Sequence, residues 1–195
     1  MDAIKAGADV SVCGDCPLRL NPKTGKKLCY VTQRRPSGVY RSYTNDKLPI
    51  VKIDARSNIW FDLKPLRIGS YGDPTAIPIE VWTDWVGLLK SRKIRHTGYT
   101  RRWENPENQG FRKFLMASVF SDEEQELASS MGWRTYRILP KGVAVPPNQI
   151  LCPGSKEAGL LKTCRECLMC GGTSRRSDVA VYAHGYNESL FTGVS

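Results

Sequence analysis

Seven cysteines are the residues of this 195-residue chain whose spacing points most clearly to chemistry. They fall into two sets, an amino-terminal C-x2-C-x12-C pattern of Cys13, Cys16 and Cys29 and a carboxyl-terminal C-x11-C-x2-C-x2-C pattern of Cys152, Cys164, Cys167 and Cys170. A two-residue gap lets one turn direct two sulfur atoms at the same ion. An odd number of cysteines, with no secretion signal before them, favours a reducing compartment in which clustered thiols hold metal. We therefore expect all seven to be metal ligands, in two sites or in one shared site.

The carboxyl-terminal set is typical of an iron-sulfur cluster. Three cysteines separated by two residues each resemble the run that wraps three corners of a cubane cluster, which a remote fourth cysteine completes. Cys152, followed by Pro153, is suited to be that fourth ligand. We expect a [4Fe-4S] cluster here, with zinc as the alternative because zinc also accepts four thiolates.

The amino-terminal set lacks a fourth cysteine. A closed site would borrow one of the two histidines, His96 or His184, or an acid such as Asp15. An open fourth position would instead suit a catalytic metal. We expect zinc or a second cluster at this set, and both uses of the fourth position remain open.

Strands and helices must position these cysteines, and the pattern of apolar residues that predicts them becomes regular from about Ile59 onward. Apolar alternation predicts strands at residues 66–70, 94–100, 114–120, 133–139, 149–152 and 179–183. Helices between strands favour an α/β fold with a mainly parallel sheet or a partial barrel, to which the two termini add a cysteine-rich metal-binding region. We expect one domain over residues 1–195, with a basic, cysteine-containing lead segment (1–36), an α/β core (59–140) and a cysteine-rich segment with the last strand (149–195).

Three helices are predicted. Ser37 is a suitable cap for a short helix that carries Val39, Tyr40 and Tyr43 on one side and ends at residues 45–46. A second helix enters at Pro78 and has apolar residues at helical spacing, namely Ile79, Trp82, Val86 and Leu89. A third begins with a capping box from Ser121 to Glu124 and is expected to bury Leu127 and Met131.

The carboxyl ends of parallel strands are where ligands collect in α/β proteins. Here those ends carry an acid, a phenol and an imidazole, which are the candidate catalytic side chains Asp73, Tyr99 and His184. Arg101 and Arg102 follow the second of these strands. We expect several of these groups to converge on one edge of the sheet.

A formal charge of +10 favours a polyanionic partner such as nucleic acid or nucleotides. The candidate contacts are Arg34, Arg35, Arg92, Lys93, Arg101 and Arg102, and nearby rings that can stack on bases are Tyr30, Tyr40, Tyr43 and Trp103. The alternative is a basic surface that only keeps the protein soluble. No recognised nucleic-acid module, phosphate-binding loop, dinucleotide fingerprint or serine-hydrolase elbow is present.

No membrane-spanning segment is expected, because no apolar run approaches about 18 residues. The opening residues also lack the apolar stretch of a secretion signal. We therefore expect a cytoplasmic protein that has no membrane partner.

Several motifs together resemble a known family. They are residues 6–19 (AGADVSVCGDCPLR), Cys29-Tyr-Val, residues 67–74 (RIGSYGDP), residues 97–100 (TGYT), residues 116–119 (MASV), residues 132–137 (GWRTYR), Cys152-Pro, residues 164–172 (CRECLMCGG) and Ala183-His-Gly. The chain resembles, over nearly its whole length, a family of uncharacterised proteins encoded by bacteriophages and prophages. The resemblance implies a phage accessory protein in the cytoplasm of a host bacterium. Arg101-Arg102 stand where that family carries a His-Gln pair, which weakens any catalytic role at this position.

A looser resemblance is to the partial barrels of radical S-adenosylmethionine enzymes, although their C-x3-C-x2-C motif is missing. Three functions are therefore predicted. The first is a phage accessory protein with a cysteine-ligated metal centre that contacts nucleic acid or nucleotides. The alternatives are an iron-sulfur enzyme of the radical S-adenosylmethionine kind, and a zinc-stapled, non-enzymatic inhibitor or adaptor of a host protein.

Overall fold

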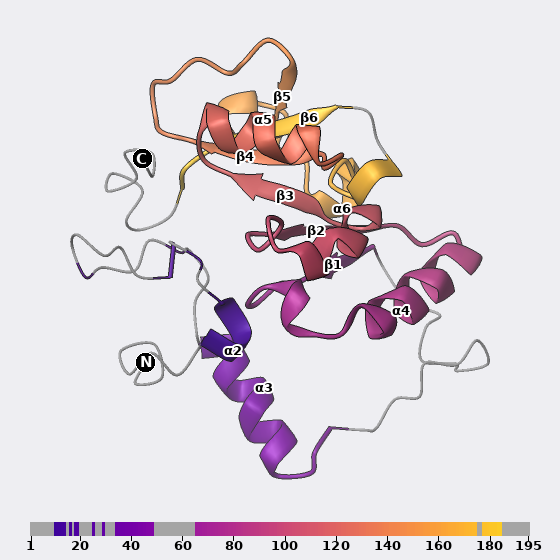
Figure 1. Ribbon diagram of the computed structural model, residues 1–195. Helices are drawn as coiled ribbons and strands as arrows, with labels where there is room; N and C mark the ends of the chain where they lie inside the picture. The colour runs from indigo at the N-terminus through magenta and orange to yellow at the C-terminus, as the bar shows by residue number, and fades with distance from the viewer. Residues whose placement is uncertain are drawn as a thin grey trace.

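A six-stranded parallel sheet forms the centre of the protein, shown as a computed structural model in Figure 1. The structure describes residues 10–14, 16, 18–19, 25, 29, 34–48, 65–174 and 177–184. The strands are Leu66–Ile68 (β1), His96–Thr100 (β2), Met116–Val119 (β3), Thr135–Leu139 (β4), Gln149–Leu151 (β5) and Asp178–Tyr182 (β6), in the order β1-β2-β3-β4-β6-β5. The predicted α/β fold with a mainly parallel sheet is confirmed. The sheet is not closed into a barrel.

The connections between β1 and β4 cover one face of the sheet. They contain α4 (Ile79–Ser91), the 3-10 helix η3 (Pro106–Lys113) and α5 (Asp122–Ser130). Side chains from all three pack against the strands in one apolar core, which includes Ile68, Trp103, Phe111, Ala117, Val119 and Ala128. This arrangement follows from right-handed crossovers, because successive steps in one direction across a sheet place their helices on the same face.

The connection from β5 to β6 runs in the other direction. β6 lies between β4 and β5, so the chain steps back toward the centre of the sheet after β5. A right-handed crossover that steps backward lies on the opposite face. The cysteine-rich segment with η4 (Lys156–Ala158), α6 (Cys164–Cys167) and η5 (Gly172–Ser174) makes this crossover, and its Met169 and Cys170 pack with Met116 and Val179.

The predicted helical stripes are mostly confirmed. In α4, Ile79, Trp82 and Val86 pack on the core, and Leu89 is buried. In α5, the Ser121 side chain accepts a hydrogen bond from the Glu124 backbone N–H at 3.2 Å, as a capping residue should. The expected burial of Leu127 is wrong, because Gln125 and Ala128 face the sheet and Leu127, one residue away around the helix, lies 49% exposed.

The amino-terminal part contributes two described helices, α2 (Val10–Cys13) and α3 (Arg34–Thr44). Ser37 lies inside α3 and is not its cap, so the predicted start is wrong. The predicted end is confirmed, since Asp46 adopts a left-handed conformation with φ of 52°. In the described part of the chain, no helix is long and apolar enough to cross a membrane.

Candidate metal centres

Two of the carboxyl-terminal cysteines, Cys152 and Cys170, pack in one apolar cluster on the face of the sheet that α4 and α5 leave uncovered. Cys170 is buried against Met116 and Val179, which stand near the starts of β3 and β6. Cys152 joins the same cluster from the end of β5 and is half-buried. Cys164 and Cys167 begin and end α6, where Cys164 is exposed and Cys167 is half-buried.

The local sequence explains how α6 presents its two sulfur atoms. Glu166 accepts hydrogen bonds from the Thr163 backbone N–H at 2.7 Å and from its hydroxyl at 2.8 Å, which forms a capping box. The helix ends after one turn because Leu168 takes a left-handed conformation with φ of 54°. Cys164 and Cys167, three residues apart, therefore share one side of the turn. The reversal at Leu168 directs the chain inward toward Cys170.

Arg134 fixes this segment to the sheet. Its guanidinium group donates to the carbonyl oxygens of Met169 at 3.1 Å and Gly172 at 2.7 Å, and also to that of Ser177. Burial lowers the pKa of Arg134, so these carbonyl groups compensate a charge that is only 8% exposed. The Gly98 N–H on β2 also donates to the Cys170 carbonyl at 3.0 Å.

Hydrogen-bond donors near two thiols oppose the effect of burial on their pKa values. The Tyr99 hydroxyl lowers the pKa of Cys170, and the Gly154 N–H lowers that of Cys152. The Ser155 N–H donates to the Cys152 carbonyl oxygen at 2.9 Å. Burial nevertheless raises the pKa of Cys170 to about 12 and also raises the pKa of Cys152. The other cysteines of the set add to both shifts through their charges, so the four thiols are electrostatic neighbours. Without a cation, these raised pKa values keep the Cys152 and Cys170 thiols protonated at neutral pH.

The sulfur atoms of the described cysteines are not arranged as a complete metal site. Among the described residues, no three or more Cys, His, Asp or Glu side chains form a group that could hold a metal ion. A metal centre at either cysteine set therefore remains a prediction.

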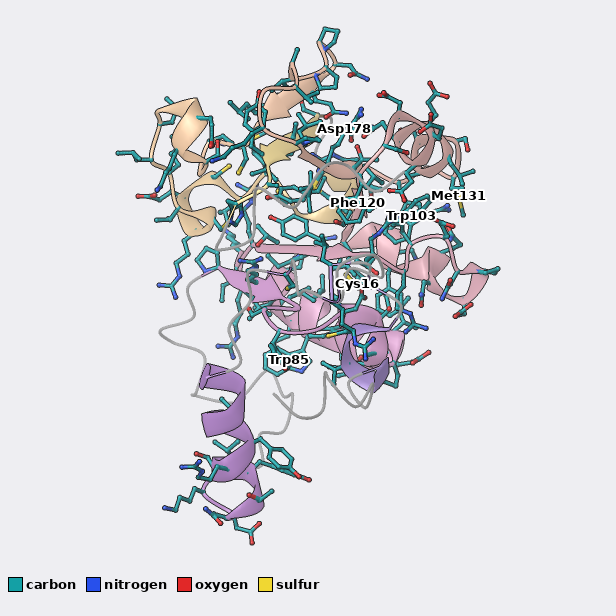
Figure 2. All side chains as sticks on the ribbon, turned by 90° about the vertical axis from the view of Figure 1, so that its left-hand side faces the viewer. Cys16, Trp85, Trp103, Phe120, Met131 and Asp178 are labelled. Atoms are coloured by element: carbon teal, nitrogen blue, oxygen red, sulfur yellow. The ribbon has the colours of Figure 1, made fainter. Side chains whose placement is uncertain are left out.

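The amino-terminal set lies at the carboxyl edge of the sheet. The Cys29 N–H donates to the Leu18 carbonyl at 2.7 Å, and the Leu18 N–H donates to the Cys16 sulfur. Leu18 packs with Phe120 and Ala183, which follow β3 and β6, and Figure 2 labels Cys16 and Phe120 in the centre of the molecule. Burial raises the pKa of Cys16 to about 11, and the nearby Cys29 thiol raises it further.

Two glycines let this set dock closely on the sheet. The Asp73 N–H donates to the Val12 carbonyl at 2.7 Å. A Cβ atom on Gly72, whose φ is 77°, would lie 2.3 Å from the Val12 side chain. A Cβ atom on Gly14, whose φ is 59°, would lie 2.7 Å from Cδ of Arg102. Both positions thus require glycine for conformation and for space.

The side chains predicted to converge at the carboxyl edge do so in part. The Asp73 carboxylate accepts from the Thr100 hydroxyl at 2.8 Å and from the Arg101 backbone N–H at 2.8 Å. It also caps η2 (Pro74–Ala76) by accepting from the Thr75 N–H at 3.0 Å. Asp73 therefore joins the ends of β1 and β2, with its oxygen atoms already in use.

The other two catalytic candidates lie elsewhere. Tyr99 is directed at Cys170, on the side of the carboxyl-terminal set, and its ring stacks on Tyr136 with centroids 4.1 Å apart. His184 is exposed after β6. The structure therefore does not bring Asp73, Tyr99 and His184 together as one catalytic group.

The predicted nucleic-acid contacts do not form a single patch. Arg92 and Lys93 follow α4 and precede β2, whereas Arg101 and Arg102 follow β2, so the two pairs lie at opposite ends of that strand. The guanidinium group of Arg101 is paired with Glu124 and lies over the Phe120 ring at 4.3 Å. Trp103 is fully buried, so the expectation that it stacks on bases is wrong. The side chains of Arg34 and Arg35, as well as Tyr30, Asp15 and Gly185, lie outside the described residues.

Sequence reasoning missed two residues that organise these sites. Glu124 was predicted only to be a capping-box residue. It also forms a salt bridge with Arg101 and accepts a hydrogen bond from the Phe120 N–H at 2.8 Å. Arg134, the anchor of the carboxyl-terminal set, carries no local signal, because its partners are 35 or more residues away.

Comparisons with known proteins do not assign the chain to a family. The resemblances to phage-encoded proteins and to radical S-adenosylmethionine enzymes stay predictions, as do the phage accessory role and the host-protein adaptor. No family model, no curated protein and no solved structure matches the chain.

Proposed function

We propose that this protein binds a thiolate-ligated metal centre through Cys152, Cys164, Cys167 and Cys170. A [4Fe-4S] cluster is the preferred occupant, and zinc is the alternative. The proposal depends on one observation, which is that Cys152 and Cys170 pack in one apolar cluster on the sheet while the same crossover carries Cys164 and Cys167 three residues apart in α6.

Hydrogen-bond donors are what a metal-bound thiolate needs. Hydrogen bonds to ligand sulfur atoms orient them and spread their negative charge. The Gly154 N–H near Cys152 and the Tyr99 hydroxyl near Cys170 could act in this way. A buried thiol that is protonated gains nothing comparable from them, whereas a bound cation would displace the proton and use the donors fully.

The proposal requires a local closure of the site. Cys170 and Cys152 are held from within the sheet, so Cys164 and Cys167 would have to move toward them. α6 is one turn long, and Cys164 is exposed, so this movement breaks few contacts. The main body of the fold would keep its arrangement.

The test is metal analysis of anaerobically purified protein together with its absorption spectrum. We expect about one four-iron cluster per chain at this set, with a broad absorption band in the visible range. If zinc is bound instead, we expect one zinc ion per chain and no visible absorption band. Cys170→Ser and Cys152→Ser should each lose that metal. Arg165→Ala, an exposed neighbour in α6, is the matched control and should keep it.

Metal-free protein from anaerobic cells, or variants that retain full metal, would reject the proposal. Any metal at the amino-terminal set would add to the total, so the same analysis on Cys13→Ser/Cys16→Ser/Cys29→Ser protein separates the two sets.

A second candidate function is an iron-sulfur enzyme that uses the amino-terminal set. Its support is the position of Cys16 and Cys29 at the carboxyl edge of a parallel sheet, beside Asp73 and Arg101. This edge is where α/β enzymes bind substrates. Reconstituted protein with a reductant should then cleave S-adenosylmethionine, and the triple serine variant should not. Absence of cleavage by reconstituted wild-type protein would reject this function.

A further inference from the structure

Helix α3 carries three large, exposed side chains close together, Val39, Tyr40 and Tyr43. Figure 1 shows it standing away from the sheet, and Figure 2 shows its side chains extending into open space. Tyr40 and Tyr43 are each 67% exposed, and Val39 is 59% exposed. A Cβ atom on Gly38 would meet nothing within 4 Å. Contiguous exposed side chains of this kind, rimmed by polar residues, are a feature of binding sites.

The end of α3 is well defined, which fixes how the two tyrosines lie. The Asp46 N–H donates to the Tyr43 carbonyl at 3.0 Å, and the Lys47 N–H donates to the Ser42 carbonyl at 2.9 Å. With Asp46 left-handed, these bonds form a Schellman motif. Tyr40 and Tyr43 are three residues apart, so their rings project from the same side of the helix, one turn from each other.

The segment that carries these rings is basic in sequence. Residues 34–48 contain Arg34, Arg35, Arg41 and Lys47 but only one acid, Asp46. Arg41 lies between the two tyrosines in sequence and is exposed. The whole chain carries a formal charge of +10. Such a helix attracts a polyanion and repels a basic partner.

The apolar stripe is too short for a protein groove. Helices that bind in grooves present anchors over two turns, at positions i, i+3, i+4 and i+7. In α3 the stripe consists of Val39, Tyr40 and Tyr43 and covers about one turn. Flat rings interleaved with cations instead match the stacking and phosphate contacts that bind unpaired bases.

We propose that α3 binds single-stranded nucleic acid, with Tyr40 and Tyr43 stacking on bases and Arg41 contacting the phosphates. This inference does not depend on a metal centre. Of the rings expected from the sequence to stack on bases, it keeps the exposed Tyr40 and Tyr43 and leaves out Trp103, which is buried.

The test is fluorescence anisotropy with labelled single-stranded DNA and RNA of mixed sequence, at two salt concentrations. We expect wild-type protein to bind, and Tyr40→Ala/Tyr43→Ala to bind at least tenfold more weakly. Tyr40→Phe/Tyr43→Phe keeps the rings and should bind within about threefold of wild type. Arg41→Ala should reduce the slope of log affinity against log salt by about one.

The matched control is Leu160→Ala/Leu161→Ala, which removes an exposed apolar pair elsewhere and should leave binding unchanged. Circular dichroism of each variant establishes that it is folded. The proposal is overturned if wild-type protein does not bind, if the alanine variant binds as well as wild type, or if the phenylalanine variant loses as much as the alanine variant. A tyrosine-dependent dimer in light scattering, without nucleic-acid binding, would identify α3 as a self-association helix and also overturn it.

Discussion

His96 is expected to make the free energy of unfolding depend on pH. Its Nε2–H donates to the Phe114 carbonyl at 3.1 Å, between β2 and the segment before β3. Burial lowers the pKa of His96 below 6.5, and the hydrogen bond to Phe114 opposes only part of that shift. As the pH falls through 6.5, the unfolded chain therefore takes up a proton before the folded chain does. The free energy of unfolding should decrease over this range.

Urea unfolding at pH 7.5 and pH 5.5 measures this effect. His96→Gln retains a donor for the Phe114 carbonyl and should show a smaller decrease between the two pH values than wild type. His184→Gln changes the exposed histidine and should behave like wild type. A pH dependence that His96→Gln leaves unchanged would show that other groups cause it.

Tyr99 offers a residue-scale test of the carboxyl-terminal centre. Tyr99→Phe removes the hydroxyl that donates to the Cys170 sulfur but keeps the ring that stacks on Tyr136. Loss of such an outer hydrogen bond typically weakens metal affinity by about 10–100-fold. Competition with a chromophoric chelator measures the affinity, and Tyr136→Phe is the control. Equal affinities for Tyr99→Phe and wild type would mean that the hydroxyl does not support a metal ligand.

The chemistry of single residues was only partly predictable from the sequence. The spacing of the cysteines identified the two sets, and strand ends correctly placed Asp73 beside Thr100 and Arg101. The use of the Arg101 side chain could not be predicted, because its partner Glu124 lies in α5, 23 residues away in the sequence. A charged residue looks the same in sequence whether it meets solvent or a buried partner.

At the scale of elements, a glycine turn fixes the cysteine-rich segment to the sheet. Gly172 has a φ of 64°, and a Cβ atom there would lie 2.6 Å from the Lys113 carbonyl oxygen and the Phe114 nitrogen. Gly159 has a nearly equal φ of 66° but open space around it. Gly159→Ala should therefore cost only the conformational strain, about 1–2 kcal/mol.

Gly172→Ala should cost more, because overpacking against backbone adds about 1–3 kcal/mol to the same strain. Urea unfolding of both variants measures the difference, and it should be accompanied by greater exposure of Cys170 to a thiol reagent. Equal stabilities for the two variants would show that the segment shifts without cost. Such a result would contradict tight docking of the segment.

Elements were predictable where their pattern is local. All six strands were expected within two residues at either end, and Ser121 caps α5 as expected. The capping box is only half formed, because Glu124 accepts from the Phe120 N–H and not from the Ser121 N–H. The error at Leu127 arose because the sheet-facing stripe of α5 includes a polar residue, Gln125. Gln125 accepts hydrogen bonds from Thr135 at 2.6 Å and Gln149 at 3.0 Å, so its burial depends on two strands that follow it.

At the scale of the whole molecule, the position of β6 between β4 and β5 separates the two cysteine sets. The step back across the sheet places the carboxyl-terminal set on one face, beside the starts of β3 and β6. The amino-terminal set contacts residues that follow β1 and β3. Sequence alone left open whether one ion serves both sets, because strand order is not encoded in any local pattern. The observed neighbours favour two separate sites.

Two separate sites should contribute unequally to stability. The carboxyl-terminal segment is held by Arg134, by Gly98 and by its own burial, so a metal there would be coupled to the core. The amino-terminal set meets the sheet through the Val12–Asp73 hydrogen bond and the contacts of Leu18 and Arg102.

Loss of metal binding at a core site removes several kcal/mol of folding free energy, which lowers the melting temperature by on the order of 10 °C. We therefore expect Cys152→Ser/Cys170→Ser to lower the melting temperature of metal-loaded protein by that amount. Cys13→Ser/Cys16→Ser/Cys29→Ser should lower it by only a few degrees, as calorimetry can measure. Equal decreases would indicate that the two sets stabilise one cooperative unit, and a larger decrease for the amino-terminal variant would make that set the structural one.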